Sequence, residues 1–186
     1  MIDNTSLATK LALRRQLLRQ YHAGQPLRVL DCCAGTGAIW TRLRHEFPVS
    51  SYLGIDQKGG AGLLKTDSRR VLAGHAWDAD VVDIDTYGAP WPHWLSVISD
   101  PRPTALTVFL TYGRWPGHAT TLSNAARELA GFGDLVVPPS ITGNLLRWLD
   151  LQFLAAARTF GWTLTAWSAR PPLGDLAIYY GVRLAR

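Results

Sequence analysis

The stretch from Leu27 to Trp40, LRVLDCCAGTGAIW, constrains the fold of this chain more than any other. Four residues of strand-like character, Leu27 to Leu30, lead into Asp31, and the small-residue turn Ala34-Gly35-Thr36-Gly37 follows. An apolar run after the turn indicates the start of a helix. Glycines let a backbone approach a ligand closely, and the first turn of a helix offers free N–H groups. The stretch is therefore typical of a sheet that binds a nucleotide-like ligand.

The glycine spacing differs from that of dinucleotide-binding proteins. Their fingerprint is G-x-G-x-x-G, in which the third glycine allows close contact between helix and strand. Here Trp40 stands at the third position, and an acid, Asp31, precedes the glycines. Because a large indole prevents that close contact, the pattern disfavours a nicotinamide-dependent oxidoreductase.

Strand-like and helix-like segments alternate along the chain. The expected strands are 27–30, 51–55, 63–66, 79–84 and 105–111, and the expected helices are 5–22, 38–47, 68–72, 91–99, 119–130 and 143–160. Two last strands, 162–168 and 176–184, are joined by a short Pro-Pro-Leu-Gly turn, so they pair antiparallel, because a parallel pair needs a long crossover. The alternation predicts an α/β, Rossmann-like fold with a mostly parallel seven-stranded sheet, a C-terminal antiparallel hairpin and helices on both faces.

The composition fits one globular domain over residues 1–186. Of the residues, 47% are hydrophobic and 18% charged, which suits a packed core and argues against disorder. No apolar run is long enough to span a membrane, and Lys10, Arg14 and Arg15 interrupt the only signal-like stretch. We therefore expect a cytoplasmic protein. The adjacent Cys32 and Cys33 and the scattered histidines predict neither a disulfide nor a metal site.

The helix expected at 5–22 belongs to an N-terminal segment, 1–24, that we expect to pack on the domain. One side of this helix is basic, and two interpretations of that side are open: a solvated helix face, or a contact with nucleic acid. The formal net charge of +5, supplied mostly by arginine, is compatible with a nucleic-acid partner. The basic residues are Lys10, Arg14, Arg15 and Arg19.

Four of the expected parallel strands are followed by an acid. The carboxyl ends of parallel strands meet at one edge of a sheet, where ligands bind. A carboxylate about 20 residues beyond the glycine turn is placed to accept both ribose hydroxyls of a nucleotide, and Asp56 has this position. For any one of these acids, a helix N-cap is the alternative. The four acids are Asp31, Asp56, Asp67 and Asp85.

The run Asp31-Cys32-Cys33-Ala34-Gly35-Thr36-Gly37-Ala38 resembles the D-x-F-A-G-T-G-A turn of class I S-adenosylmethionine-dependent methyltransferases that modify nucleobase amino groups. The resemblance extends from Leu27 over nearly the whole remaining chain and implies S-adenosylmethionine as cofactor. It implies that Asp31 holds the cofactor's ammonium, Asp56 its ribose and Asp67 its adenine amino group. The whole implied cofactor-binding set is Asp31, Ala34, Gly35, Gly37, Asp56, Asp67, Ser68 and Asp83.

A second stretch, Asp83-Ile84-Asp85-Thr86-Tyr87-Gly88-Ala89-Pro90, resembles the D-x-D-P-[FY]-G-[SA]-P signature of tRNA guanine-N2 dimethyltransferases. The resemblance implies two catalytic residues: Asp85, which accepts hydrogen bonds from the target amine, and Tyr87, which stacks on the base. It also implies that Gly88 leaves room for the base. Thr86 stands where the family has proline, so the shape of this loop is open. The alternative is that both aspartates are ordinary strand-end carboxylates and Tyr87 packs against the sheet.

The loop that follows the expected fifth strand, residues 111–118, opens at the same edge of the sheet. Arg114 is a candidate for gripping a phosphate, and Trp115 is a candidate for stacking on a base. A capped loop with a buried tryptophan is the equal alternative.

Together these observations favour a methyltransferase that acts on an exocyclic amine of a nucleobase in RNA or DNA, with RNA favoured over DNA. A second hypothesis keeps the cofactor and changes the substrate to a protein or small molecule, because Thr86 replaces the proline and we see no appended RNA-binding domain. A third is a non-catalytic chain that keeps the fold and works with a partner subunit. We expect no metal and no membrane in any of these.

Overall fold

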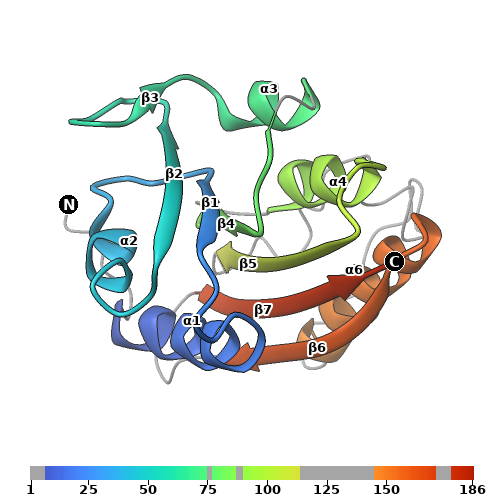
Figure 1. Ribbon diagram of the computed structural model, residues 1–186. Coiled ribbons are helices and arrows are strands. Elements are labelled where there is room, and N and C mark those ends of the chain that lie inside the picture. The colour runs from blue at the N-terminus through green and yellow to red at the C-terminus, as the bar shows by residue number, and fades with distance from the viewer. Residues whose placement is uncertain (1–6, 75–76, 87–89, 114–144, 171–176) are drawn as a thin grey trace.

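The computed structural model describes residues 7–74, 77–86, 90–113, 145–170 and 177–186. These residues form one seven-stranded sheet with the strand order β3-β2-β1-β4-β5-β7-β6 (Figure 1). The strands are β1 (Leu27–Asp31), β2 (Val49–Asp56), β3 (Leu64–Lys65), β4 (Val81–Ile84), β5 (Ala105–Gly113), β6 (Thr163–Arg170) and β7 (Ala177–Ala185). The helices are α1 (Leu7–Tyr21), α2 (Ala38–Leu43), α3 (Ser68–Ala73), α4 (Trp91–Ser99) and α6 (Leu145–Thr159).

The pairing of the strands confirms the predicted mixed sheet. Strands β1 to β5 run parallel to one another, whereas β7 runs antiparallel to both β5 and β6. The last strand therefore lies between the fifth and the sixth. The sequence predicted the hairpin but not this insertion, because the turn fixes only which two strands are adjacent.

Helices cover both faces of the sheet, as predicted (Figure 1). Helices α1 and α2 share one core with alternate residues of β1, including Leu27 and Val29. Helices α3, α4 and α6 share the other core with residues such as Leu30 and Val82. Helix α1 lies close to β7 at Gly181, where an added Cβ would come within 3.0 Å of Leu17 Cδ2. That glycine thus sets how near the N-terminal helix can lie to the sheet.

The predicted helix boundaries differ from the structure chiefly at α2, which ends at Leu43 rather than near residue 47. Beyond it the chain tightens into i→i+3 hydrogen bonds, from His45 to Arg42 and from Glu46 to Leu43. The reason is Pro48, which disfavours helical conformation in the residue before it. The expected helix 119–130 and the turn at 171–174 lie outside the described residues. Within the described ranges, no helix is both long enough and apolar enough to cross a membrane.

Strand alternation places the acids of β1 and β4 on the face that α1 covers. Leu27, Val29 and Asp31 alternate along β1, and the first two pack with α1. Asp31 is the register partner of Asp83 on β4. The two carboxylates therefore lie side by side at the carboxyl edge of the sheet, under the N-terminal helix.

Candidate functional site

The glycine turn after β1 has the backbone form that a ligand-binding loop needs. Gly35 and Gly37 have φ values of 56° and 70°, which non-glycine residues rarely adopt. The Gly37 N–H donates to the Ala34 carbonyl at 2.7 Å, and the Ala34 N–H donates to the Ile55 carbonyl at 2.9 Å. An added Cβ at Gly35 would meet no atom within 4 Å. The turn is fixed to the sheet on one side and open on the other.

Asp56, at the end of β2, lies directly beside this turn. Its Oδ2 accepts a hydrogen bond from the Gly35 N–H at 3.1 Å, and its Oδ1 accepts one from the Lys58 N–H at 2.8 Å. The side chain belongs to a half-buried residue. Sequence spacing alone had linked Asp56 to the glycine turn, and the two are in contact.

Asp31 is a buried carboxyl group with 4% exposure. Its Oδ2 accepts a hydrogen bond from the Tyr52 hydroxyl at 2.9 Å. Burial, and then the neighbouring charge of Asp83, raise the pKa of Asp31 well above its usual value, although the Tyr52 hydrogen bond acts in the opposite direction. The Tyr52 hydroxyl passes over Gly54, where an added Cβ would lie only 2.7 Å away. The approach of Tyr52 to Asp31 therefore depends on a glycine at that position.

Asp83 is fully engaged by the protein itself. Arg14 donates Nε to Oδ2 at 2.7 Å and Nη2 to Oδ1 at 2.5 Å, and Trp40 donates Nε1 to Oδ2 at 2.8 Å. Both partners of the ion pair are 1% exposed. Burial lowers the pKa of Arg14, but the charge and hydrogen bonds of Asp83 outweigh it and raise that pKa. The indole at the third position of the glycine frame thus serves as a buried donor to the β4 acid.

Asp85 lies just past the end of β4 and forms an ion pair with a cation of the N-terminal helix. Lys10 of α1 donates Nζ to Asp85 Oδ2 at 2.7 Å, and the two side chains are 8% and 17% exposed. The next residue, Thr86, donates its hydroxyl to the Thr111 carbonyl of β5 at 3.2 Å. The hydroxyl thus ties the ends of β4 and β5 together at the position where the resembling family has proline. Four predicted site residues lie outside the described residues: Tyr87, Gly88, Arg114 and Trp115.

Asp67 caps helix α3, so the N-cap alternative is confirmed for this acid. Its Oδ1 accepts the Arg69 N–H at 3.0 Å, and its carboxylate also pairs with the Arg69 guanidinium at 2.6 Å. The hydrogen bond from the Arg69 side chain, together with the weaker backbone bond, lowers the pKa of Asp67 to about 2. Ser68 is buried and its Oγ lies 2.9 Å from His93 Nε2. Burial lowers the pKa of His93 to about 4.

The structure corrects both interpretations of the basic side of α1 for Lys10 and Arg14, whereas Arg19 stays 70% exposed, as a solvated face predicts. Lys10 and Arg14 neither face solvent nor form a nucleic-acid surface, because both are buried against the acids of β4. Arg15 and Arg19 approach Glu46 instead, at 2.5 Å and 3.8 Å. Sequence periodicity could not find the pairs of Lys10 and Arg14, because their partners lie 75 and 69 residues away. The one available signal was the match between cations one helical turn apart and acids two residues apart.

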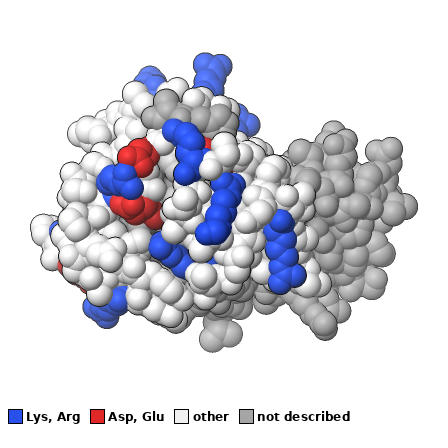
Figure 2. All heavy atoms as spheres, turned by 45° about the vertical axis from the view of Figure 1, so that its right-hand side comes forward, with Lys and Arg blue, Asp and Glu red and all other residues white. Residues whose placement is uncertain are grey.

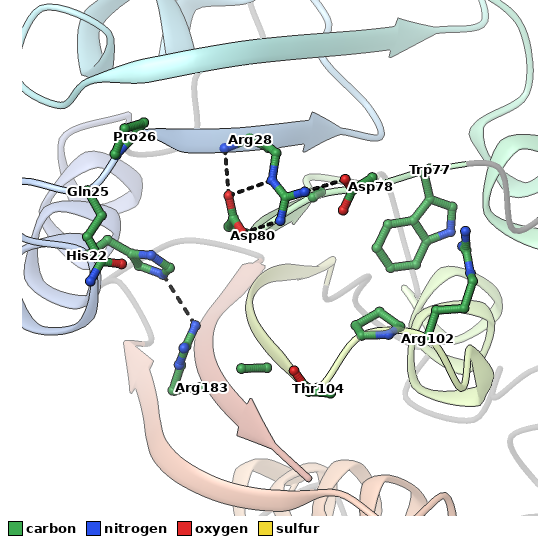
Figure 3. A pocket seen from close by; sticks show the side chains of 13 residues that line it. His22, Gln25, Pro26, Arg28, Trp77, Asp78, Asp80, Arg102, Thr104 and Arg183 are labelled. Carbon is green, nitrogen blue, oxygen red and sulfur yellow. Dashed lines mark hydrogen bonds and ion pairs between the residues drawn. The ribbon is translucent and has the colours of Figure 1, made fainter.

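The opposite, amino edge of the sheet carries a hollow of about 540 Å³. In Figure 3, Arg28 and Asp80 line one side of it and Arg183 and His22 line another, with Trp77 and Arg102 at one end. We call this the amino-edge hollow. None of the predicted site residues lies in it. Among the described residues, no group of three or more histidine, cysteine or acidic side chains gathers in a form that could hold a metal ion.

Comparison with solved structures places this chain in a known fold. Trm1 from Pyrococcus horikoshii, solved with S-adenosyl-L-methionine, matches with a TM-score of 0.69 and 15% identity over 96% of this chain and 55% of that one. The plantazolicin methyltransferase BamL, solved with a triazolic desmethylPZN analogue and SAH, gives 0.56 at 9% identity over 96% and 84%. TYW2 from M. jannaschii, solved with AdoMet, gives 0.54 at 10% identity over 95% and 77%.

The chain has the methyltransferase fold of these proteins. It spans about half the length of the Pyrococcus horikoshii chain, at 55%. No protein-family model and no curated protein matches the sequence, so the likeness rests on structure. The predicted fold class is confirmed by strand order and by likeness together.

Proposed function

We propose that this protein is an S-adenosylmethionine-dependent methyltransferase that acts on an exocyclic amine of a nucleobase, in RNA rather than DNA. The observation that carries the proposal is the contact between the Gly35 N–H and Asp56 at 3.1 Å, at the same sheet edge as Asp31 and Asp85. A glycine turn, a ribose-binding acid and a substrate-side acid thus meet at the edge where open α/β sheets bind ligands.

The residues of this edge fit the proposed cofactor. The backbone at Gly35 is free of neighbours on its open side, so a ligand can approach it closely. Asp31 is a buried carboxyl group whose hydrogen bonding within the described residues involves Oδ2 alone, which suits an ammonium group at its other oxygen. Asp56 is already oriented by two backbone N–H groups and suits ribose hydroxyls. When bound, the cofactor would supply an electrophilic methyl group.

The remaining members of the set have graded roles in this proposal. The turn consists of Ala34, Gly35 and Gly37. The start of α3, with Asp67 and Ser68, would contact the adenine of the cofactor. Asp67 could accept a hydrogen bond from adenine only on the side of its carboxylate that Arg69 does not contact. Asp83 has its hydrogen bonds occupied by Arg14 and Trp40, so we assign it the support of its neighbours rather than direct cofactor contact.

On the substrate side, Asp85 would accept hydrogen bonds from the N–H groups of the target amine. An exocyclic base amine is a poor nucleophile because its lone pair is delocalised into the ring. A carboxylate that accepts hydrogen bonds from the amine favours tetrahedral geometry at the nitrogen and so frees its lone pair. The ring of Tyr87, stacked on the base, would hold the amine in line with the methyl group. Gly88 would leave room for the base. No base needs to remove a proton before attack, since methyl transfer itself makes the amine acidic.

Charge supports a nucleic-acid substrate over a small molecule. The formal net charge is +5, and Lys and Arg side chains outnumber acidic ones on the face shown in Figure 2. Such a balance attracts phosphate backbones at long range. Arg114 and Trp115 remain predicted phosphate and base contacts.

The first test is calorimetric titration with S-adenosylhomocysteine. We expect micromolar binding to the wild type and loss of binding in Asp56→Ala, because the ribose loses its acceptor. Asp78→Ala is the matched control, since Asp78 is 77% exposed at the amino edge and far from the turn. Binding that survives in Asp56→Ala, or is absent from the wild type, would contradict the cofactor assignment.

The second test measures transfer of a labelled methyl group to a random-sequence RNA transcript pool, followed by nucleoside analysis. We expect a methylated amine on adenine, cytosine or guanine, and none in an all-uridine RNA, because uracil lacks an exocyclic amine. A random-sequence DNA pool serves as comparison and should receive less label than the RNA pool.

A protein or small molecule is the second candidate substrate. Thr86 in place of the family's proline favours it, as does the structural likeness to BamL, whose name gives plantazolicin as substrate. Methyl transfer into a cell extract that persists after nuclease treatment would support this candidate and contradict the first.

A further inference from the structure

Helix α1 supplies two cations to the acids of β4 in matching register. Lys10 and Arg14 are four residues apart, so they lie about 6 Å apart along the helix. Asp83 and Asp85 are two residues apart on an extended chain, which spans roughly 6.6 Å. Lys10 contacts Asp85 at 2.7 Å and Arg14 contacts Asp83 at 2.5 Å. One helix therefore docks on the motif through two parallel ion pairs.

The two ion pairs differ in what they leave available. Arg14 uses both oxygens of Asp83, and Trp40 adds a third hydrogen bond, so that carboxylate is saturated. Lys10 uses only Oδ2 of Asp85. Within the described part of the chain, Asp85 Oδ1 makes no hydrogen bond, and the side chain keeps 17% exposure. Asp85 is thus held in place while one oxygen stays open to a donor from outside.

The local charges explain why such a hold is needed. Asp85 lies near two further carboxylates, those of Asp83 and Asp31, and Arg14 already serves Asp83. Like charges in a partly buried cluster repel, so an unpaired Asp85 would turn towards solvent. The Lys10 ammonium also makes a cation–π contact with the Tyr179 ring, whose centroid lies 5.4 Å from Nζ. The lysine is therefore a fixed anchor rather than a mobile surface cation.

We infer that Lys10 is a positioning residue for the reaction: it holds Asp85 Oδ2 so that Oδ1 faces the incoming amine. The inference rests on the proposed function, because it acts through Asp85. It makes the N-terminal helix part of the active site, where the sequence pattern gave only a basic surface. Lys10 itself touches neither substrate nor cofactor.

The test compares Lys10→Met, Lys10→Arg, Asp85→Asn and the double variant Lys10→Met/Asp85→Asn on the random-sequence RNA pool. We expect Lys10→Met to lower kcat by roughly tenfold to a hundredfold, with KM little changed, because misplacement of a positioned group acts on the transition state. Lys10→Arg should restore most of the rate. In the Asp85→Asn background, Lys10→Met should have no further effect, because the residue acts only through Asp85.

Two controls separate positioning from folding. S-adenosylhomocysteine affinity and the thermal unfolding midpoint of Lys10→Met show whether the fold and cofactor site survive. Arg15→Met removes an ion pair from the same helix, with Glu46, and should leave kcat unchanged.

The outcomes also separate this inference from the proposed function. A wild type that transfers no methyl group to RNA sinks the proposed function and the inference together. An active wild type whose Lys10→Met variant keeps its kcat, or whose double variant is slower than Asp85→Asn alone, overturns the inference and leaves the function standing.

Discussion

The two edges of the sheet carry charged clusters of opposite character. At the carboxyl edge, Asp31, Asp83 and Asp85 face two cations from α1, and the Arg14–Asp83 pair is 1% exposed on both sides. At the amino edge, arginines line the hollow, and Arg28 pairs with Asp80 and Asp78 while remaining 42% exposed (Figure 3). The three acids of the first cluster outnumber its two cations, whereas the three arginines that line the hollow outnumber the two acids that line it.

This difference shows at which edge the burial of charge costs folding free energy. Exposed ion pairs contribute little to stability, whereas buried charges are expensive to desolvate and costly to leave unpaired. The Arg28 pairs of the amino edge therefore join strands at little cost in stability. The carboxyl edge concentrates buried charge in one place, a pattern that is typical of functional sites.

The largest expected effect follows from removing the buried guanidinium. Arg14→Met leaves Asp83 and Asp31 facing each other with only Trp40 as a donor to Asp83, and we expect a loss of about 3–5 kcal/mol in the free energy of unfolding. Urea denaturation measures it. Arg28→Met at the amino edge should cost at most about 1 kcal/mol. Equal losses at both edges would refute the comparison.

A rescue variant sharpens that result. Arg14→Met/Asp83→Leu removes both partners of the buried ion pair, so much of the lost stability should return; the remaining loss includes the Trp40 Nε1–H, which no longer has its acceptor. Continued instability would mean that Arg14 acts through packing, for instance against the Phe109 ring, 5.0 Å away.

The second effect concerns His93, whose imidazole is buried between α4 and α3. Its pKa is about 4 in the folded protein, against 6.5 for an ordinary histidine, because burial disfavours the charged form. The stability linked to this neutral ring is present above pH 6.5 and is lost as pH falls towards 4, by at most about 3 kcal/mol. The wild type should lose more stability over this interval than His93→Gln. Superimposable curves would show that the pKa of His93 is the same in the folded and the unfolded protein, which would contradict this prediction.

The third effect is on binding rather than folding. Because the pKa of Asp31 is raised by burial and by Asp83, this carboxyl holds its proton more strongly than usual. An ammonium ligand needs the ionised form, so affinity for S-adenosylhomocysteine should rise with pH, by up to about tenfold per unit, until Asp31 is ionised in the free protein. Calorimetry at several pH values measures this. In Asp31→Asn the dependence should flatten, and an unchanged slope would place the titrating group elsewhere.

Local pattern was enough for the fold and for the glycine turn, but not for the supports of the site. The positions of Asp31, Gly35 and Asp56 at the carboxyl edge could be predicted, because strand ends and turns are readable from nearby residues. Tyr52, Trp40 and Lys10 could not, because each reaches a residue far along the chain. The direction in which the basic side of α1 faces depends on packing against β7 at Gly181, which no local period encodes.

The smallest expected effect tests the departure of this chain from the family signature. Thr86 donates its hydroxyl to the Thr111 carbonyl at 3.2 Å, between the ends of β4 and β5. Thr86→Val keeps the shape and removes the bond, so we expect a loss of about 1 kcal/mol in the free energy of unfolding. Thr165→Val removes an exposed bond of the same kind, to the Arg183 carbonyl, and should cost less.

The same variant also distinguishes stability from function at the carboxyl edge. If the Thr86 hydroxyl shapes the loop that follows Asp85, Thr86→Val should reduce methyl transfer more than its small stability loss explains, with S-adenosylhomocysteine affinity unchanged. A rate that merely follows stability would mean that the hydroxyl only joins two strand ends. The carboxyl edge would then depend at this position on the same kind of simple strand-joining contact as the amino edge.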